Sequence, residues 1–376
     1  KAPALLVRLG VFLLIVALSW QLTQDERQAW MLGLAHWLNP ALMLSGSTLG
    51  YLDPLCWGPG IVAVVLAASH RARAAGVVLG LTLLVKHQGV FFVLPVLALL
   101  WRSPGMMTCF RWTVAVALAG VAPFLIFGDP EQFVLAMQVN AQGGMLSGDA
   151  LNLWWIVTAA GLLKESGLAA MDMPMRAREI WWTQWGVVEI LRVSTGLLVG
   201  GVAVWATLRV RKVASLPGAA ALGAFSIHTY FVMAVGVHEN HLVYAVPLAG
   251  IVVLYWREYW PIFMGLSAMV TINLLLFYGL GRDFDRPPRT GPFLPVTVVL
   301  SAINLALLWT HLRIFLAHTS YSETGSSGSA SDTSLTSGSI SEAIDTTRSP
   351  SARSISRTPC VSRPMGRRPE AGIRMI

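Results

Sequence analysis

A lysine, a histidine and a glutamine stand together in the middle of a long apolar stretch, at Lys86, His87 and Gln88. Ionisable side chains inside or beside membrane spans are costly and by default mark functional sites. An ammonium group there is suited to neutralise a phosphate, and the adjacent imidazole and amide add hydrogen-bond donors. The alternative is a snorkelling lysine that anchors a helix end, which needs neither His87 nor Gln88.

A second polar group, His238-Glu239-Asn240-His241, separates two apolar runs. Two imidazoles, a carboxylate and an amide so close together are suited to contact phosphate and sugar hydroxyls. Glu239 is placed to orient His238 by accepting a hydrogen bond from its ring. The His-x-x-His spacing also suits a metal ion, but no third ligand is obvious, so we expect no metal. A helix cap with solvated polar residues is the alternative.

Two further polar groups flank apolar runs. Tyr51 and Asp53 follow an Asn-Pro pair at 39–40, and Asn152 and Trp154 begin another apolar segment. An asparagine beside indole rings at the membrane interface is suited to contact a sugar ring, although a belt of aromatic residues explains the tryptophan equally well. Taken alone, Asp53 has the pattern of an ordinary turn residue.

The elements that must position these groups are membrane helices. Of the 376 residues, 55% are hydrophobic and only 12% are charged, whereas soluble domains carry about 25% charged residues. We predict an all-α polytopic membrane protein, a bundle of about 9–11 transmembrane helices that include short or re-entrant ones. The net charge of +8 lies mostly in short loops and does not indicate nucleic acid. The apolar runs are 4–22, 31–49, 55–69, 74–101, 112–128, 150–163, 185–208, 217–237, 242–256, 260–280 and 293–317.

The cationic connections between the runs set the predicted sidedness, because they are expected on the cytoplasmic side. Residues 74–101 must then turn back on themselves near Lys86; the alternative is one long tilted helix with a buried lysine. Residues 129–183 must lie on the outer face, with the short run 150–163 re-entrant or interfacial. All four polar groups then share the outer face and predict a cavity there. The connections contain Arg71, Arg73, Arg102, Arg111, Arg209, Arg211, Lys212, Arg257 and Arg313.

Composition divides the chain into a transmembrane domain, residues 1–318, and a tail. From residue 319 the sequence is rich in Ser, Thr and Gly with scattered Arg, and such a segment buries too little apolar surface to fold. We predict a disordered cytoplasmic tail over residues 319–376. Cys56, Cys109 and Cys360 are far apart and form neither a metal-ligand pattern nor a disulfide framework.

The order of the polar groups along the chain and the residues within them resemble those of a known enzyme class. Residues 39–53 (NPALMLSGSTLGYLD), 81–95 (LTLLVKHQGVFFVLP) and 237–247 (VHENHLVYAVP) are similar to three blocks of the GT-C integral-membrane glycosyltransferases, which use polyprenyl- or dolichyl-phosphate sugars. The resemblance is to the dolichyl-phosphate-glucose glucosyltransferases and to bacterial mannosyltransferase-like proteins, over roughly residues 1–255. The stretch Asn-Leu-Trp at 152–154 is similar to one in the bacterial members.

The resemblance implies a GT-C-like fold and the transfer of a hexose, glucose or mannose, from a polyprenyl-phosphate carrier to a lipid-linked glycan or similar acceptor. It implies no cofactor and no metal. A carboxylate deprotonates the acceptor hydroxyl, and fixed positive charge stabilises the departing lipid phosphate. The residues expected to supply that charge are Lys86 and His238, with His87 or His241. The residues expected to contact the sugar or the acceptor are Gln88, Asn240, Asn152 and Trp154, with Glu239, Tyr51 and Asp53 completing the binding site.

The chain departs from the family's pattern at three points. The first block often has Gln where this chain has Tyr51. The third block has Lys where this chain has Asn240, which removes one cation, and His241 is expected to replace it in part. The family's catalytic carboxylate lies in a first outer loop, which is expected upstream of Lys1, so we assign no catalytic residue within this chain. As it stands, the chain is expected to be an incomplete or inactive form.

A membrane transporter or lipid flippase is the main alternative, because intramembrane lysine and histidine also mark substrate paths and proton relays. Such proteins usually contain internal repeats, and the two halves of this chain show no convincing recurrence. A non-catalytic membrane subunit is a third possibility. For the enzyme, we expect the endoplasmic reticulum membrane in a eukaryote, or the plasma or inner membrane in a bacterium.

Overall fold

The computed structural model describes residues 2–129 except 102, short pieces at 131–132, 135 and 146–148, residues 150–167 and 169, residues 186–278 except 213, and residues 293–320. Six helices in these ranges are long and apolar enough to cross a membrane, and four shorter apolar helices accompany them. The protein is therefore an all-α multi-pass membrane protein, as predicted.

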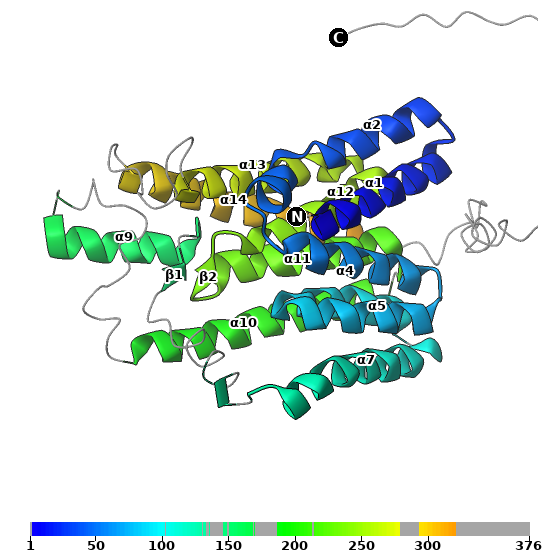
Figure 1. Cartoon of the computed structure of the whole chain (residues 1–376). Helices are drawn as coiled ribbons and strands as arrows, with labels where there is room; N and C mark the ends of the chain where they lie inside the picture. Colours follow the sequence, from blue (N-terminus) through cyan, green and yellow to red (C-terminus); the bar gives the residue numbers. More distant parts are fainter. Residues whose placement is uncertain are drawn as a thin grey trace, which may run out of the picture. The chain divides into compact units, whose positions relative to one another are not determined.

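Figure 1 shows the order of the elements along the chain. The first half contains α1 (Ala2–Thr23), α2 (Glu26–Trp37), α3 (Pro40–Leu42), a π-helix (Met43–Thr48), α4 (Asp53–Ala68), α5 (Ala72–Val85), a 3₁₀-helix (His87–Phe92), α6 (Val93–Leu100) and α7 (Gly105–Phe127). The second half contains β1 (Ser147–Gly148), α9 (Leu153–Ser166), α10 (Val187–Val210), α11 (Leu216–Met233), β2 (Val237–His238), 3₁₀-helices at His241–Tyr244 and Arg257–Tyr259, α12 (Ala245–Tyr255), α13 (Trp260–Tyr278) and α14 (Phe293–Ser320).

Helix α11 lies at the centre of the helical unit. Its sequence is mostly apolar or small on every side, which is the pattern of a helix enclosed by others. Of its 18 residues, 83% are buried. It packs against α4, α6, α10, α12 and α14. In helices α7 and α10, by contrast, only 11% and 17% of the residues in the most apolar 18-residue stretch are buried. Their exposed apolar faces are suited to contact lipid.

The apolar stretch 74–101 turns back on itself, which confirms the hairpin interpretation. Helix α5 ends at Val85, and Lys86 has an extended backbone with φ −160° and ψ 142°. A 3₁₀-helix and α6 then return the chain, so that Gly105, at the start of α7, packs against Ala72, at the start of α5. The polar triplet therefore lies at the far end of a hairpin rather than inside one long helix.

Two glycines one turn apart bring α5 and α7 into close contact. A Cβ at Gly76 would come within 2.3 Å of the Cys109 carbonyl oxygen, and one at Gly80 within 2.9 Å of the Thr113 carbonyl oxygen. Small residues at this spacing let the backbones of membrane helices approach closely. The Thr113 hydroxyl also donates to the carbonyl of Gly76, at 3.1 Å.

Several of the predicted cationic connections meet at one end of the unit, which we call the arginine end (Arg71, Arg73, Arg209 and Arg211). The Arg73 guanidinium lies over the ring of Trp112 and that of Arg211 over the ring of Trp101, at 4.3 and 4.9 Å from the ring centroids. The Arg209 side chain donates to the Ser320 hydroxyl at 2.7 Å. The assignment of this end to the cytoplasm stays a prediction.

The Asn-Pro pair at 39–40 breaks the apolar run 31–49, as its sequence indicates. The Asn39 side chain accepts a hydrogen bond from the amide of Ala41 at 3.1 Å, and Pro40 starts a short helix that continues as the π-helix. Single π-helical turns are rare and often occur at functional sites.

Two predictions fall wholly or partly outside the described residues. Helix α14 continues to Ser320, two residues past the predicted domain boundary. The rest of the predicted tail lies outside the described residues, as does most of the predicted outer loop 129–183. By contacts, the chain divides into residues 1–331, which hold every described element, and residues 332–376.

Candidate functional site

The centre of the candidate site is the carboxylate of Asp53, the first residue of α4. Asp53 is fully buried, and the two oxygens of its carboxylate accept four hydrogen bonds. The Oδ1 atom accepts from the Lys86 ammonium and the Tyr244 hydroxyl, both at 2.8 Å. The Oδ2 atom accepts from the Ser45 hydroxyl at 3.2 Å and from the Asn240 amide at 3.3 Å. Asp53 is therefore not the solvated turn residue that its local pattern alone indicates.

Lys86 keeps a path to the surface while it pairs with Asp53. Its side chain is 29% exposed, whereas that of Asp53 is 1% exposed. An ammonium group has three N–H donors, and the bond to Asp53 uses one of them. Since a buried charge needs a partner, Lys86 compensates the charge of Asp53, and this bond leaves two of its N–H groups unused.

A short parallel strand pair positions the segment 237–241 beside Asp53. Ser147 and Gly148 of β1 pair with Val237 and His238 of β2. The amide of Glu239 then donates to the carbonyl of Gly148 at 3.2 Å. Gly236, with φ +75°, has the left-handed backbone that turns the chain from α11 into β2 and that favours glycine.

Glu239 is a second buried carboxylate, close to the first. Its Oε1 atom accepts from the hydroxyls of Tyr51 and Tyr278, at 3.0 and 3.2 Å. Its Oε2 atom lies 3.9 Å from Nδ1 of His238, whose side chain is 43% exposed. This distance is too long for a short hydrogen bond. The proposed hydrogen-bonded orientation of His238 by Glu239 stays a prediction.

His241 joins the two polar groups that the sequence separates by 150 positions. Its Nε2 atom lies 2.8 Å from Nε2 of Gln88, and its Nδ1 atom lies 3.2 Å from the Tyr230 hydroxyl. The rings of His87 and His238 lie 6.4 and 5.6 Å from its ring. Because both ring nitrogens contact protein groups and the residue is only 8% exposed, His241 is poorly placed to replace the family's lysine as a cation.

Asn152 and Trp154 anchor a helix instead of facing the site. The buried Asn152 caps α9 by accepting from the amide of Trp155 at 2.9 Å, and its own amide donates to the Phe231 carbonyl at 3.2 Å. The indole of Trp154 donates to the Met233 carbonyl at 2.7 Å. Both polar ends of the Asn152 side chain are therefore used by the protein, and the expected sugar contact of this residue stays a prediction. The two residues hold α9 against the end of α11, just before the segment 237–241.

Sequence reasoning missed Arg8, although it stands inside the apolar run 4–22. It is 3% exposed, and its guanidinium donates to the Ser47 hydroxyl and, at 2.7 Å, to the Trp37 carbonyl at the end of α2. Ser47 belongs to the π-helix that also carries Ser45, a donor to Asp53. Arg8 therefore fixes the segment that helps to hold Asp53, and it carries the same signal that singles out Lys86.

A second buried polar chain, which sequence reasoning also missed, runs between α11 and α14. Asn304 donates its amide N–H to the Leu151 carbonyl at 2.8 Å, so its Oδ1 atom must accept from Nε2 of His228 at 3.1 Å. The other nitrogen of neutral His228 then accepts from Nδ1 of His311, at 3.1 Å. His311 in turn accepts from the Tyr259 hydroxyl. With both imidazoles neutral, all donors along this chain point the same way.

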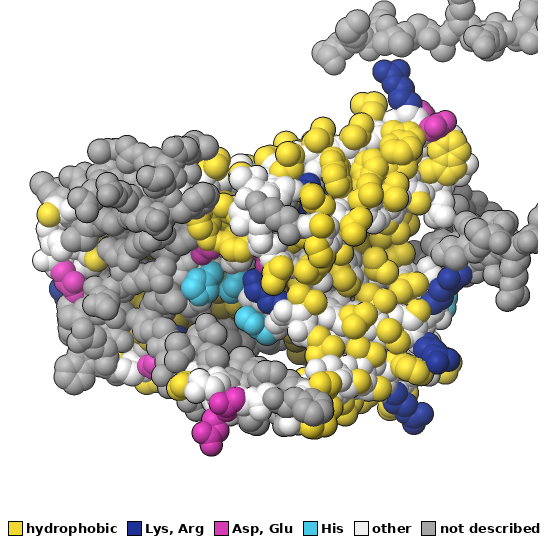
Figure 2. All heavy atoms as spheres, viewed as in Figure 1, with side chains coloured by type: hydrophobic (Ala, Val, Ile, Leu, Met, Phe, Trp, Pro, Cys, Tyr) yellow, Lys and Arg dark blue, Asp and Glu magenta, His cyan; other side chains and the backbone are white. Residues whose placement is uncertain are grey.

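The candidate site as a whole is a cation-bearing hollow with spare acceptors. Figure 2 shows histidine side chains beside basic and acidic ones at a hollow in a face that is otherwise largely hydrophobic or not described. The Oε1 atom of Gln88 and the Oδ1 atom of Asn273 are buried with no hydrogen-bond partner among the described residues. Within the same ranges, no group of three or more His, Cys, Asp or Glu side chains is arranged to hold a metal ion.

Comparisons of the chain with protein-family models, with curated proteins and with solved structures give no match.

Proposed function

We propose that this protein is a membrane hexosyltransferase of the GT-C type. It takes glucose or mannose from a polyprenyl-phosphate carrier and passes it to a lipid-linked glycan or a similar acceptor on the outer or lumenal face. The donor is the substrate, and no separate cofactor takes part. The residues around Lys86 and His238 bind the phosphate and the sugar of the donor.

The convergence of three distant polar segments supports this proposal most directly. Asp53 binds both Lys86 and Asn240, while Tyr51 binds Glu239. The segments 51–53, 86–88 and 238–241 thus form one cluster, joined by side-chain hydrogen bonds, between apolar helices. Polar groups that pack so closely in an apolar bundle need a reason beyond folding, since each costs free energy to bury.

The exposed side of the cluster has the charge that a phosphate needs. Lys86 and His238 have side chains that are 29% and 43% exposed, and His87 is exposed beside them. Asp53 and Glu239 lie on the protein side, where they are buried. The carboxylates therefore lie behind Lys86 and His238, whose side chains face the opening, an arrangement that is suited to an anionic headgroup.

The chemistry assigned to these residues is stabilisation of the leaving group. In the transfer, the acceptor oxygen forms a bond to the anomeric carbon while the bond from that carbon to the phosphate oxygen breaks. The proton of the acceptor hydroxyl goes to a base, and the polyprenyl phosphate departs with the electron pair. A fixed ammonium and imidazole stabilise the charge that develops on the phosphate, at no cost of reorganisation. The oxygens of Gln88 and Asn273 are buried without a partner among the described residues, so sugar hydroxyls reach them only after the side chains around them move.

The test is transfer by the full-length protein in liposomes that contain a radiolabelled polyprenyl-phospho-hexose and a lipid-linked acceptor. Lys86→Ala and His238→Ala are each expected to reduce transfer by about 10²-fold or more, since groups that stabilise transition-state charge contribute on that scale. Lys164→Ala is the matched control, because Lys164 is an exposed lysine on α9, and it is expected to leave transfer unchanged. Undiminished transfer in both site variants would contradict the proposal.

A transporter or lipid flippase is the second candidate, and one observation favours it. The chain from Tyr259 through His311 and His228 is a line of buried groups that can exchange protons, as in proton-coupled carriers. The discriminating experiment is movement of a fluorescent polyprenyl phosphate between leaflets of sealed liposomes, followed by quenching from outside. Movement that is lost in His311→Phe, without any hexose transfer in wild type, would favour this second function.

A further inference from the structure

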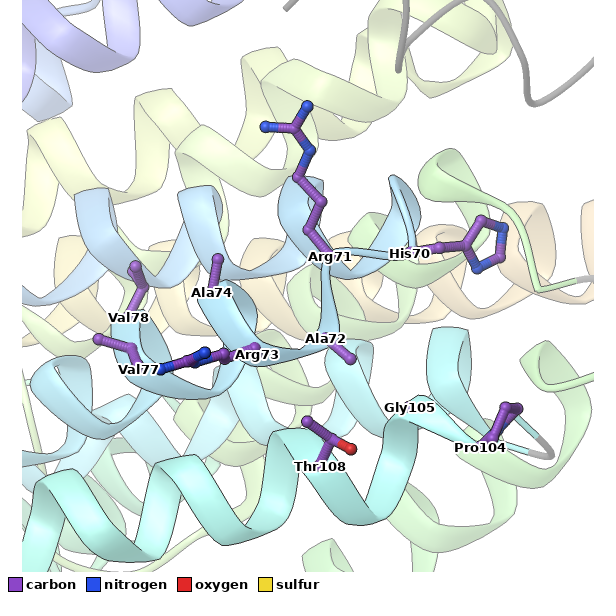
Figure 3. A pocket seen from close by; sticks show the side chains of 10 residues that line it. All are labelled: His70, Arg71, Ala72, Arg73, Ala74, Val77, Val78, Pro104, Gly105 and Thr108. Carbon is purple, nitrogen blue, oxygen red and sulfur yellow. The ribbon is translucent and has the colours of Figure 1, made fainter. Parts of the chain in front are cut away.

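A groove between α5 and α7 lies at the arginine end of the unit, and the proposed transferase site does not use it. Its volume is about 800 Å³, and it is formed where the start of α5 faces the start of α7 (Figure 3). The residues that line it are His70, Arg71, Ala72, Arg73, Ala74, Val77, Val78, Pro104, Gly105 and Thr108. We call this cavity the α5–α7 groove.

The lining of the α5–α7 groove includes two arginines, Arg71 and Arg73. Figure 3 shows Arg73 on α5 and Thr108 on the facing helix α7, with Arg71 and His70 extending from the turn before α5. The guanidinium of Arg73 is held over the ring of Trp112, 4.3 Å from its centroid. No acidic residue is among the described residues that line the groove. The lining is therefore complementary to an anion.

The rest of the α5–α7 groove is apolar and open to the side. Beyond the charged turn, Ala74, Val77 and Val78 form an apolar wall. Helix α7 is one of the helices whose apolar face is mostly exposed. A ligand that fills the groove must therefore combine an anionic head near the arginines with an apolar part that follows the helices toward the bilayer. A phospholipid has this chemistry, and basic pockets between membrane helices bind anionic lipid headgroups.

We propose that the α5–α7 groove binds the headgroup of an anionic phospholipid, with the phosphate at Arg73, further positive charge from Arg71 at the edge of the groove, and an acyl chain along Val77 and Val78. The proposal stands apart from the transferase site, which lies at the opposite end of the α5 hairpin. It also gives the close packing at Gly76 a second role. The tight α5–α7 contact at Gly76 is next in the chain to Val77, which lines the groove, so it holds the two walls of the groove together.

The test is lipid binding by the full chain in nanodiscs, measured by native mass spectrometry. Phosphatidylglycerol and phosphatidylcholine with the same acyl chains are compared in the wild type, in Arg73→Gln and in Arg71→Gln/Arg73→Gln. The preference for phosphatidylglycerol is expected to fall about fivefold for each guanidinium removed, because one basic residue near a lipid headgroup contributes on that scale. Arg111→Gln is the matched control, since Arg111 is exposed on α7 and does not line the groove.

Two further measurements test separately where the lipid lies and whether the charge of Arg73 is what binds it. Phosphatidylglycerol with a photoreactive acyl chain is expected to crosslink to the segment that contains Val77 and Val78 in the wild type, and less in the double variant. Arg73→Lys is expected to retain most of the lipid preference, which shows that a loss in Arg73→Gln reflects charge rather than misfolding. An equal loss in Arg111→Gln, no preference in the wild type, or displacement of the lipid by inorganic phosphate alone would each overturn the proposal.

Discussion

Replacing Lys86 by methionine removes an ammonium but keeps the length of an unbranched side chain, and it leaves Asp53 buried without its cation. Breaking a buried ion pair from one side costs about 3–5 kcal/mol, because the remaining charge is uncompensated. The Lys86 side chain is 29% exposed, and Asp53 keeps three other donors. We therefore expect a loss near the lower limit, about 3 kcal/mol of the free energy of unfolding.

Asp53→Asn removes the other charge and is expected to cost less, because Lys86 can extend toward its exposed side. In the double variant no buried charge is left, so part of the stability lost in Lys86→Met should return. The coupling energy from this double-mutant cycle is expected to be about 1–3 kcal/mol, a size typical of contacting groups. Reversible unfolding in mixed detergent micelles measures all four proteins.

The same four proteins separate stability from function. If Lys86 binds the lipid phosphate, the double variant regains stability yet stays as deficient as Lys86→Met in binding a polyprenyl-phospho-hexose. Additive effects, with a coupling energy below about 0.5 kcal/mol, would refute the ion pair. Recovery of donor binding together with stability would refute the functional role of the ammonium.

Three further variants test other parts of the structure. Gly76→Ala is expected to destabilise the protein by about 1–3 kcal/mol, because the added methyl group meets the backbone of Cys109. The control is Gly196→Ala on α10, which has open space around it and should be neutral. Thermal unfolding measures both variants. Asn304→Ala leaves a buried imidazole donor and a buried carbonyl unpaired, so the free energy of unfolding should fall by about 2–4 kcal/mol. A loss no larger than that in Gly196→Ala would argue against the buried chain. His87→Cys should react with a membrane-impermeant maleimide from the outer side only, and labelling from the cytoplasm contradicts the predicted sidedness.

The helical, multi-pass fold could be predicted from composition, and the hairpin from the position of Lys86. Length and apolar content set the helices, because the bilayer demands about 20 apolar residues for each span. The π-helix and the strand pair could not be predicted, since a few local residues carry no periodic signal. The strand pair also depends on contacts between Gly148 and His238, which are far apart in the chain.

The ionisable members of the candidate site could be predicted better than their partners. Lys86 and Glu239 stand out because charge is rare in apolar runs, but Tyr244 and Tyr278 are tyrosines among many aromatic residues. Their importance lies in the hydroxyl contacts to the two carboxylates, which only the folded chain brings together. Asn152 has the right type and position for a sugar contact, yet helix capping uses its side chain.

Arg8, His228 and His311 were detectable by the rule that identified Lys86, since each interrupts an apolar run. Each stands alone in the sequence, and a single polar residue is weaker evidence for a functional site than a cluster of polar residues. The structure places all three in the interior. Single ionisable residues in spans therefore merit the same attention as clusters.

The one-way hydrogen-bond chain between α11 and α14 also has a mechanical consequence. While both imidazoles are neutral, the Leu151 carbonyl, which can only accept, sets the direction of every link. Sliding α14 along α11 by a single turn, about 5.4 Å, would separate His311 from His228 and Asn304 from His228 at once. These two hydrogen bonds therefore oppose sliding of α14 along α11, whereas a tilt of the two helices together leaves both bonds intact.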